Sequence, residues 1–242
     1  MKIQTILKST IVAFAGASTA QALPPSSGVA WNGCVCDSPV VLVGYDFENV
    51  SGTVNSAPPS FELAGFSGGD IAGPGVIMAN SVSGNTFGCF SGFNSNGTSG
   101  EISFKFGSGS SDDYCLSDIT FDFFAEGSSI GNHGPNLFNV AIFGDAGLIW
   151  QTEDIVAGIG SANIGSFSLF NQLGGPDALT AGELLIENGE SYNVVITAAG
   201  ANSESFGFDM DNVQVHVCPV PEPSSSLLLL LGSGFFLTRR KK

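Results

Sequence analysis

Basic residues are almost missing from the interior of this 242-residue chain. Of its seven Lys and Arg, two lie near the N-terminus, four form the C-terminus, and only Lys105 lies between them. Residues 23–220 therefore carry one positive side chain against 21 carboxylates, a net formal charge of −20. Such a body repels a phosphate backbone, so nucleic acid is excluded as a partner.

Recognisable catalytic motifs are also missing. The chain has only two histidines, His133 and His216, and it contains no metalloprotease, phosphate-loop or dinucleotide-binding motif. We therefore name no catalytic residue and expect a protein that is not an enzyme. The alternative is a polysaccharide hydrolase, because glycoside hydrolysis needs two carboxyl groups across a sugar and carboxylates are plentiful.

The first 22 residues have the pattern of a secretory signal peptide. Lys2 and Lys8 give a short basic region, an apolar run follows, and Ala20-Gln-Ala22 provides a small-residue cleavage site. We expect cleavage after Ala22, followed by a leader over residues 23–39. This pattern predicts that the rest of the chain is exported from the cytoplasm.

The last 24 residues, 219–242, have three ordered parts. Pro221-Glu222-Pro223 comes first, an uncharged and mainly apolar stretch follows, and Arg239-Arg240 begin a basic tail. As a helix, the stretch of 15 residues would span about 22 Å, which is less than the ~30 Å hydrocarbon core of a bilayer. The basic tail would stay in the cytoplasm. We therefore expect a short C-terminal helix that is held only transiently in the inner membrane.

This three-part C-terminus resembles the PEP-CTERM sorting signal of exported proteins in Gram-negative bacteria that make extracellular polysaccharide. The resemblance implies recognition by an exosortase, a membrane-embedded cysteine transpeptidase, with processing near Pro221-Glu222-Pro223. It also implies that the mature protein resides at the cell surface or in the extracellular matrix. The alternative is a permanent single-span anchor, which the short apolar stretch disfavours.

Short apolar or alternating runs, separated by Gly, Ser, Asn and Pro, predict an all-β domain over residues 40–218. Alternation is plainest in Ile102–Phe106, Ile119–Phe123 and Val213–Val217. About ten runs with turn-rich joints favour a two-sheet sandwich of jelly-roll type, with a β-helix as the alternative. One helix is expected over Ala178–Glu187. The expected strands are Val40–Phe47, Gly75–Ala79, Thr86–Phe90, Glu101–Phe106, Ile119–Phe124, Leu137–Phe143, Ser166–Phe170, Ser191–Ala198, Ser205–Phe208 and Asn212–Val217.

The two ends of this domain resemble jelly-roll carbohydrate-binding modules. Val43-Gly-Tyr-Asp-Phe47 is similar to their opening strand, and Phe208-Asp-Met-Asp-Asn-Val213 is similar to their closing strand. The resemblance implies a sandwich fold and carbohydrate as a ligand class.

Five cysteines in an exported chain predict disulfides. Cys89 and Cys115 flank one expected strand, so we expect a bridge between them. Cys34 and Cys36 precede the first strand and Cys218 follows the last, so one of the first two is expected to pair with Cys218. The state of the odd cysteine stays open.

Two further features are candidate binding sites. Asp209 and Asp211 share one face if the chain is extended, and the sandwich resemblance brings Asp46 towards them; oxygen ligands of this kind suit Ca²⁺. The alternative is that the two aspartates cap a turn. Trp150 ends an apolar run and is a candidate platform for a sugar, although a role in the core is favoured.

The sequence therefore predicts an exported, non-catalytic β-sandwich that is structural or interacts with extracellular polysaccharide. A polysaccharide-active hydrolase and a self-assembling matrix protein are the alternatives, the latter because few charged residues protect the strand edges.

Overall fold

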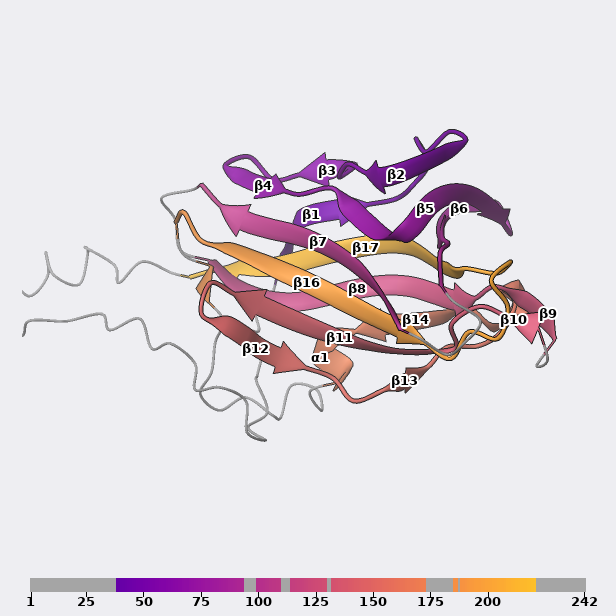
Figure 1. The fold of residues 1–242 in the computed structure, drawn as a ribbon. Helices are drawn as coiled ribbons and strands as arrows, with labels where there is room; N and C mark the ends of the chain where they lie inside the picture. Colours follow the sequence, from indigo (N-terminus) through magenta and orange to yellow (C-terminus); the bar gives the residue numbers. More distant parts are fainter. Residues whose placement is uncertain are drawn as a thin grey trace, which may run out of the picture.

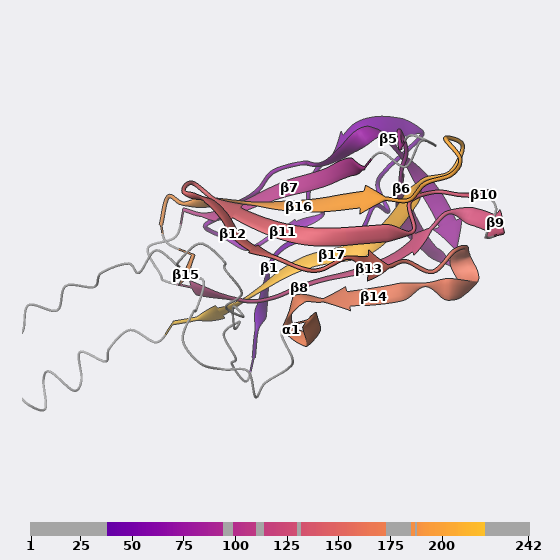
Figure 2. The same ribbon diagram turned by 60° about the horizontal axis from the view of Figure 1, so that its bottom comes forward.

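The computed structural model describes residues 38–93, 99–109, 114–129, 132–172, 185–186 and 188–220. Within these ranges nearly all of the regular structure is β-strand, and the named strands pair antiparallel in one continuous sheet and one small hairpin. The large sheet folds over on itself into two layers (Figures 1 and 2). The prediction of an all-β sandwich is therefore confirmed.

One layer is built on four neighbouring strands. The other is built on a second set of strands, which Figure 2 shows beneath the first layer. The first layer contains β7 (Gly100–Ser108), β16 (Ser191–Ala199), β11 (Leu137–Gly144) and β12 (Gly147–Gln151), with the short β4 (Phe66–Gly68) and β13 (Ile155–Val156). The second contains β1 (Val40–Tyr45), β17 (Phe208–Pro219), β8 (Tyr114–Ala125) and β14 (Gly165–Ser168), with the short β3 (Phe61–Glu62) and β15 (Leu185–Ile186).

The remaining elements join or border the layers. The layers are connected by β5 (Ile71–Val82), which pairs with β7 of the first layer and with β6 (Asn85–Phe90). In turn, β6 pairs with β17 of the second layer. The other elements are β2 (Thr53–Ala57), the hairpin β9 (Gly127–Ser129) and β10 (Asn132–His133), a 3₁₀ turn (Ser161–Asn163) and the four-residue helix α1 (Leu169–Gln172).

Alternation in the sequence decides which face of each strand is buried. Successive side chains of a strand point to opposite faces, so one apolar set can enter the core while the other meets water. In β7 the buried large apolar residues are Ile102, Phe104 and Phe106, all at most 1% exposed. The same rule buries Ile119, Phe121 and Phe123 of β8 and Val213, Val215 and Val217 of β17.

Aromatic rings fill the space between the layers. Phe138 of β11 is 1% exposed, and its ring centroid lies 4.6 Å from that of Phe123 and 5.5 Å from that of Phe208. Phe121 stacks on Phe167 at 4.6 Å and also contacts Phe138. These five rings come from four strands of both layers, so they hold the sandwich together.

The last two expected strands differ from those observed. Of the expected strand Ser205–Phe208 only Phe208 lies in a strand, whereas the expected strand Asn212–Val217 is part of β17, which begins at Phe208 and includes the polar residues between them. The backbone of β17 pairs there with β6 on one side and β8 on the other, so its N–H and C=O groups have hydrogen-bond partners that a turn would not provide. The irregularity is local: Asn212 has φ 50°, and the register with β8 shifts between Asp211 and Gln214.

The helix expected over Ala178–Glu187 is wrong where it can be compared. Leu185 and Ile186 form β15, which pairs with Tyr114 and Cys115 of β8. The rest of that range lies outside the described residues.

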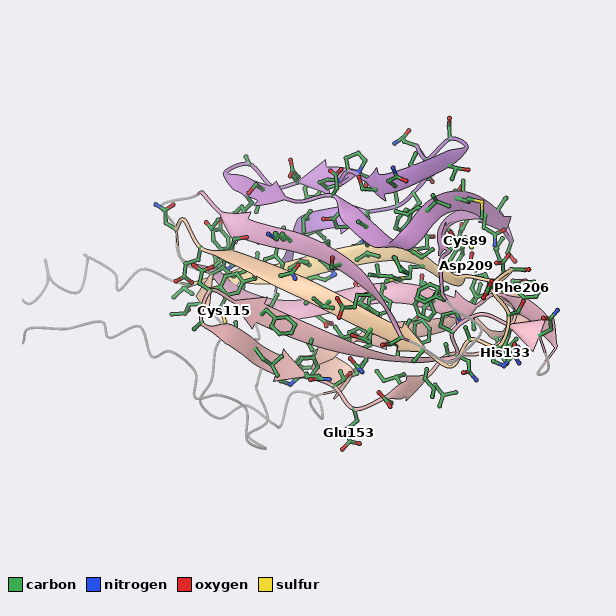
Figure 3. The ribbon with its side chains drawn as sticks, viewed as in Figure 1. Cys89, Cys115, His133, Glu153, Phe206 and Asp209 are labelled. Carbon is green, nitrogen blue, oxygen red and sulfur yellow. The ribbon has the colours of Figure 1, made fainter. Side chains whose placement is uncertain are left out.

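The expected Cys89–Cys115 bridge is also wrong. Cys89 is a free, buried thiol, whereas Cys115 is disulfide-bonded, as is Cys218. Cys89 lies opposite Asp209 and Cys115 opposite Cys218, so nine residues of β17, about 30 Å at 3.3 Å per residue, separate the two levels. Figure 3 shows Cys89 and Cys115 at opposite ends of the sandwich. Cys34 and Cys36, the expected partners of Cys218, lie outside the described residues.

Candidate functional site

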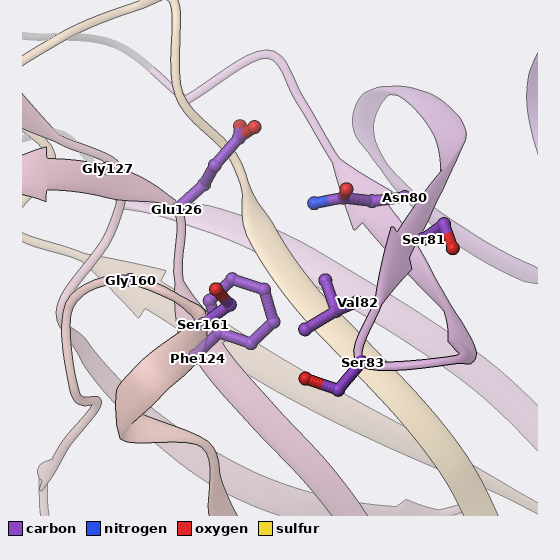
Figure 4. A pocket seen from close by; sticks show the side chains of 9 residues that line it. All are labelled: Asn80, Ser81, Val82, Ser83, Phe124, Glu126, Gly127, Gly160 and Ser161. Carbon is purple, nitrogen blue, oxygen red and sulfur yellow. The ribbon is translucent and has the colours of Figure 1, made fainter.

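A pocket of about 290 Å³ opens at the end of the sandwich where β5 turns into β6 (Figure 4). Its walls come from that turn, from the end of β8 and from the start of the 3₁₀ turn. Most of the side chains are small and polar, with Val82 and Phe124 supplying the apolar part. The residues that line it are Asn80, Ser81, Val82, Ser83, Phe124, Glu126, Gly127, Gly160 and Ser161.

The local sequence explains how this wall forms. Val82 pairs with Asn85, so Ser83 and Gly84 are the two central residues of a tight hairpin. Both have positive φ, 54° and 93°, as the hairpin turn that matches strand twist requires, and glycine adopts this conformation without strain. Ser83 at the tip of this turn and Ser81 near the end of β5 therefore both line the pocket.

Two of the lining residues connect the pocket to groups buried behind it. The Asn80 side-chain amide donates a hydrogen bond to Oδ1 of Asp209 at 2.9 Å. Oε2 of Glu126 accepts a hydrogen bond from the backbone N–H of Gly207 at 2.9 Å and a weaker one from the Cys89 thiol at 3.5 Å. Asn80 and Glu126 thus link the solvent-facing pocket to Asp209 and Cys89.

Asp209 is the most perturbed carboxyl group among the described residues. It is 0% exposed, and its Oδ2 has no hydrogen-bond partner among the described residues. The pKa of Asp209 is raised to about 7, mainly by burial; the hydrogen bond from Asn80 opposes the rise and the charge of Glu126 adds to it. Burial and the same two carboxylates also raise the pKa of the Cys89 thiol.

Asp211 belongs to a different cluster from Asp209. Its two oxygens accept hydrogen bonds from the backbone and side chain of Asn212 at 2.8 and 3.3 Å. Burial raises the pKa of Asp211 to about 6, and the charges of Asp122, Asp46 and Glu48 add to the rise. The charge of Asp46 thus acts on Asp211, whereas Asp209 has other partners. The calcium site on Asp209, Asp211 and Asp46 stays a prediction.

Trp150 does not offer a face to a sugar. It is 7% exposed and belongs to the main hydrophobic core, so the platform interpretation is wrong and the favoured role in the core holds. Trp150 lies on β12 opposite Ile142 of β11, and both side chains belong to the core.

Sequence reasoning missed Asn80, Cys89 and Glu126 as members of one site. Asn80 and Asp209 are 129 positions apart in the chain, and Glu126 and Gly207 are 81 apart. Cys89, Asp209 and Glu126 meet because β17 pairs with β6 on one side and β8 on the other, and no local sequence pattern reveals that pairing.

The end of the described chain leads directly into a recognisable segment. β17 ends at Pro219, and the residues that follow it include the Pro-Glu-Pro, apolar and basic parts described above. Residues 219–242 match the PEP-CTERM protein-sorting motif. The motif indicates an exported protein with a C-terminal segment that is transiently in the membrane. Pro221, Glu222, Pro223, Arg239 and Arg240 themselves lie outside the described residues.

The described part of the chain contains the short helix α1 and one 3₁₀ turn. None of the helices there has the length and apolar character needed to cross a bilayer. The short C-terminal helix that carries the PEP-CTERM motif was expected over residues that the structure does not describe.

Three solved structures show partial similarity. A Stig cyclase, Fisc, from Fischerella sp. TAU has a TM-score of 0.33 and 11% identity, covering 82% of this chain and 98% of that one. A family 11 carbohydrate-binding module from Clostridium thermocellum has a TM-score of 0.30 and 12% identity, covering 73% of this chain and 96% of that one. A CBM35 from Paenibacillus barcinonensis has a TM-score of 0.26 and 7% identity, covering 71% of this chain and 100% of that one. No curated protein matches the sequence.

Proposed function

We propose that this chain is an exported, non-catalytic β-sandwich of the surface or extracellular matrix of a Gram-negative bacterium, and that it contacts polysaccharide through the pocket between the β5–β6 turn and the end of β8. The observation that carries the proposal is a polar pocket on a protein with an export motif. An exosortase is the partner during maturation.

The chemistry of the pocket suits a sugar. Sugar hydroxyls both donate and accept hydrogen bonds, and serine hydroxyls, an asparagine amide and a carboxylate offer both functions. The wall presents Ser81, Ser83, Ser161, Asn80 and Glu126, all with short or partly anchored side chains. Small-molecule sites of this kind have a few convergent polar groups beside apolar ones, as Val82 and Phe124 are here.

The hydrogen bonds of other carboxylates favour a structural role over a catalytic one. Asp118 accepts from the Ser168 hydroxyl at 2.8 Å and from the backbone N–H of Phe170 at 3.0 Å, which joins β8 to β14 and α1. Asp122 of the same strand accepts from Ser166 and Asn212. With one Lys in this body, hydroxyl, amide and backbone donors take the place of cations, and these carboxylates hold strands together.

The first test concerns maturation. Mass spectrometry of the protein isolated from the producing bacterium is expected to show a new N-terminus at Leu23 and no peptide beyond about Pro223. A chain with Pro221→Ala, Glu222→Ala and Pro223→Ala is expected to keep its C-terminal segment and to stay in the inner-membrane fraction.

The control for this test replaces Pro24 and Pro25 with alanine, which changes prolines at the other end and leaves the motif intact. Recovery of mature wild-type protein that still ends at Lys242 would contradict the proposed route.

The second test concerns carbohydrate binding. Ser161 is exposed at the mouth of the pocket, and Ser161→Trp would fill it. We expect the mature wild-type protein to be retarded in native gels that contain the host polysaccharide, with no release of reducing ends. The substitution is expected to weaken the retardation at least tenfold, because each lost sugar hydrogen bond leaves a polar group unpaired.

Ser191→Trp is the matched control. Ser191 is exposed where β16 begins, beside Gly107 of β7 and at the opposite end of the sandwich, so its substitution is expected to change nothing. Equal retardation of all three proteins would place the carbohydrate contact elsewhere. Turnover of the polysaccharide that a carboxylate substitution abolishes would favour the hydrolase.

A further inference from the structure

Three acidic groups from three neighbouring strands converge behind the pocket. Cys89 lies on β6, Asp209 on β17, and Glu126 directly after β8; in this part of the sheet β17 lies between the other two. One ligand atom from each, the sulfur and two carboxylate oxygens, lies within 4.8 Å of both others. Cys89 and Asp209 are labelled side by side in Figure 3, and Glu126 is seen in Figure 4.

Burial makes this cluster unusual. Cys89 is 3% exposed and Asp209 is 0% exposed, while Glu126 is half-buried and reaches the pocket. Asp209 Oδ2 has no hydrogen-bond partner among the described residues. A buried carboxylate oxygen without a donor is costly, so this geometry requires either a proton or a cation between the three groups.

The protein supplies no Lys or Arg side chain here. Lys105 is the only Lys or Arg in residues 38–220, and it lies on β7, which pairs with β4, β5 and β16 but with none of the three strands of the cluster. Ionisation of all three groups would leave a local charge of −3 in a buried place. A bound divalent cation would compensate most of that charge.

The ligand types select among cations. Ca²⁺ and Mg²⁺ take oxygen ligands, whereas Zn²⁺ binds thiolate sulfur at ~2.3 Å and carboxylate oxygen at ~2.0–2.2 Å in tetrahedral sites. Those bond lengths place sulfur and oxygen about 3.6 Å apart around one ion. Cys89 Sγ and Glu126 Oε2 are 3.5 Å apart without any rearrangement.

We propose that Cys89, Glu126 and Asp209 form a binding site for Zn²⁺ or a similar thiophilic divalent metal. Three protein ligands leave a fourth position, and Glu126 brings that position to the edge of the pocket. The Asn80 amide, which donates to Asp209 Oδ1, leaves Oδ2 free for the metal and fixes the orientation of the carboxylate. The site stands whether or not the pocket binds carbohydrate.

The test uses the mature protein, stripped of metal with EDTA and then titrated with Co²⁺ or Zn²⁺. Co²⁺ reports its ligands, since a cobalt–thiolate bond gives a charge-transfer band in the near ultraviolet that oxygen ligands do not give. We expect one equivalent of Co²⁺, an intense thiolate band, displacement by Zn²⁺, and a rise of several degrees in the melting temperature with Zn²⁺.

Matched variants separate this site from others. Cys89→Ser is expected to abolish the thiolate band, and Asn80→Ala is expected to weaken Co²⁺ binding about 10- to 100-fold because the carboxylate loses its orienting donor. Asp145→Asn, in the exposed turn between β11 and β12 and outside the cluster, is expected to keep both. A Cys34→Ser, Cys36→Ser chain is also expected to keep them.

Several outcomes would overturn the proposal. They are less than a tenth of an equivalent of bound metal in the folded wild type, a Co²⁺ spectrum without a thiolate band, or a band that survives in Cys89→Ser. Stabilisation by Ca²⁺ that equals the effect of Zn²⁺ and persists in Cys89→Ser would equally assign the cation to oxygen ligands elsewhere. Near-ultraviolet circular dichroism of each metal-free variant verifies that it is folded.

Discussion

In EDTA, the Asp209→Asn chain is expected to be more stable than the wild type at pH 8, and its advantage is expected to shrink by about 2–3 kcal/mol at pH 5. The new amide keeps the shape of the carboxyl group and can still accept the hydrogen bond from Asn80. It cannot ionise, and ionisation of a fully buried group is what makes this position costly at high pH.

The direction follows from where the proton is bound. The pKa of Asp209 is about 7 in the folded protein and 3.8 ordinarily, so between these values the folded chain holds a proton that the unfolded chain has released. The free energy of unfolding therefore falls as pH rises through this window and is lowest above pH 7. The pKa of Asp211 is raised to about 6, so Asp211 also lowers the free energy of unfolding as pH rises. It does so equally in both chains, so its effect cancels in the comparison.

Chemical denaturation of both proteins at pH 5 and pH 8 measures the effect. Asp145→Asn is the control, because Asp145 is exposed in the turn between β11 and β12 and its substitution changes the net charge equally. If Asp209→Asn and Asp145→Asn shifted stability by the same amount at both values of pH, the buried carboxyl would not be the cause.

Phe138→Ala is expected to destabilise the sandwich by about 3–5 kcal/mol. Phe138 is 1% exposed and its ring lies against Phe121, Phe123 and Phe208, so its removal leaves a cavity between the layers. Neighbouring rings are held by strand pairing and cannot collapse fully into that space. In a domain of this size, the melting temperature is expected to fall by roughly 10 °C.

Phe61→Ala is the control for the loss of an aromatic ring. Phe61 is 49% exposed on the two-residue strand β3, so its truncation is expected to cost no more than about 0.5 kcal/mol. A similar melting temperature for both variants would show that Phe138 does not join the layers.

The long strands could be predicted because their signal is local. In Ile102–Phe106 and Val213–Val217 every second side chain is apolar, and burial follows that period directly. Short strands such as β3 and β13 carry too few residues to show a period. The continuity of β17 was missed because Asp209 and Asp211 are typical of turns, and only pairing on both sides explains a strand there.

The site could be predicted only in part. Asp209 was recognised as a candidate ligand from its neighbours in sequence, and its grouping with Asp211 was inferred from a strand period of two. The structure gives the two aspartates different partners, because Asn80 of β5 donates to Asp209 whereas Asn212, the next residue of β17, donates to Asp211. Trp150 was a candidate platform because it ends an apolar run, but in the structure its indole belongs to the core.

The sequence by itself determined the export motif, the acidic character and the all-β fold class, since each depends on composition or on residues close together in the chain. Only the tertiary structure decided that Cys89 is free and that Cys89, Glu126 and Asp209 meet behind a polar pocket. The physical reason is that sheet order brings together segments 37 to 129 positions apart, and no period within a single strand records its neighbours.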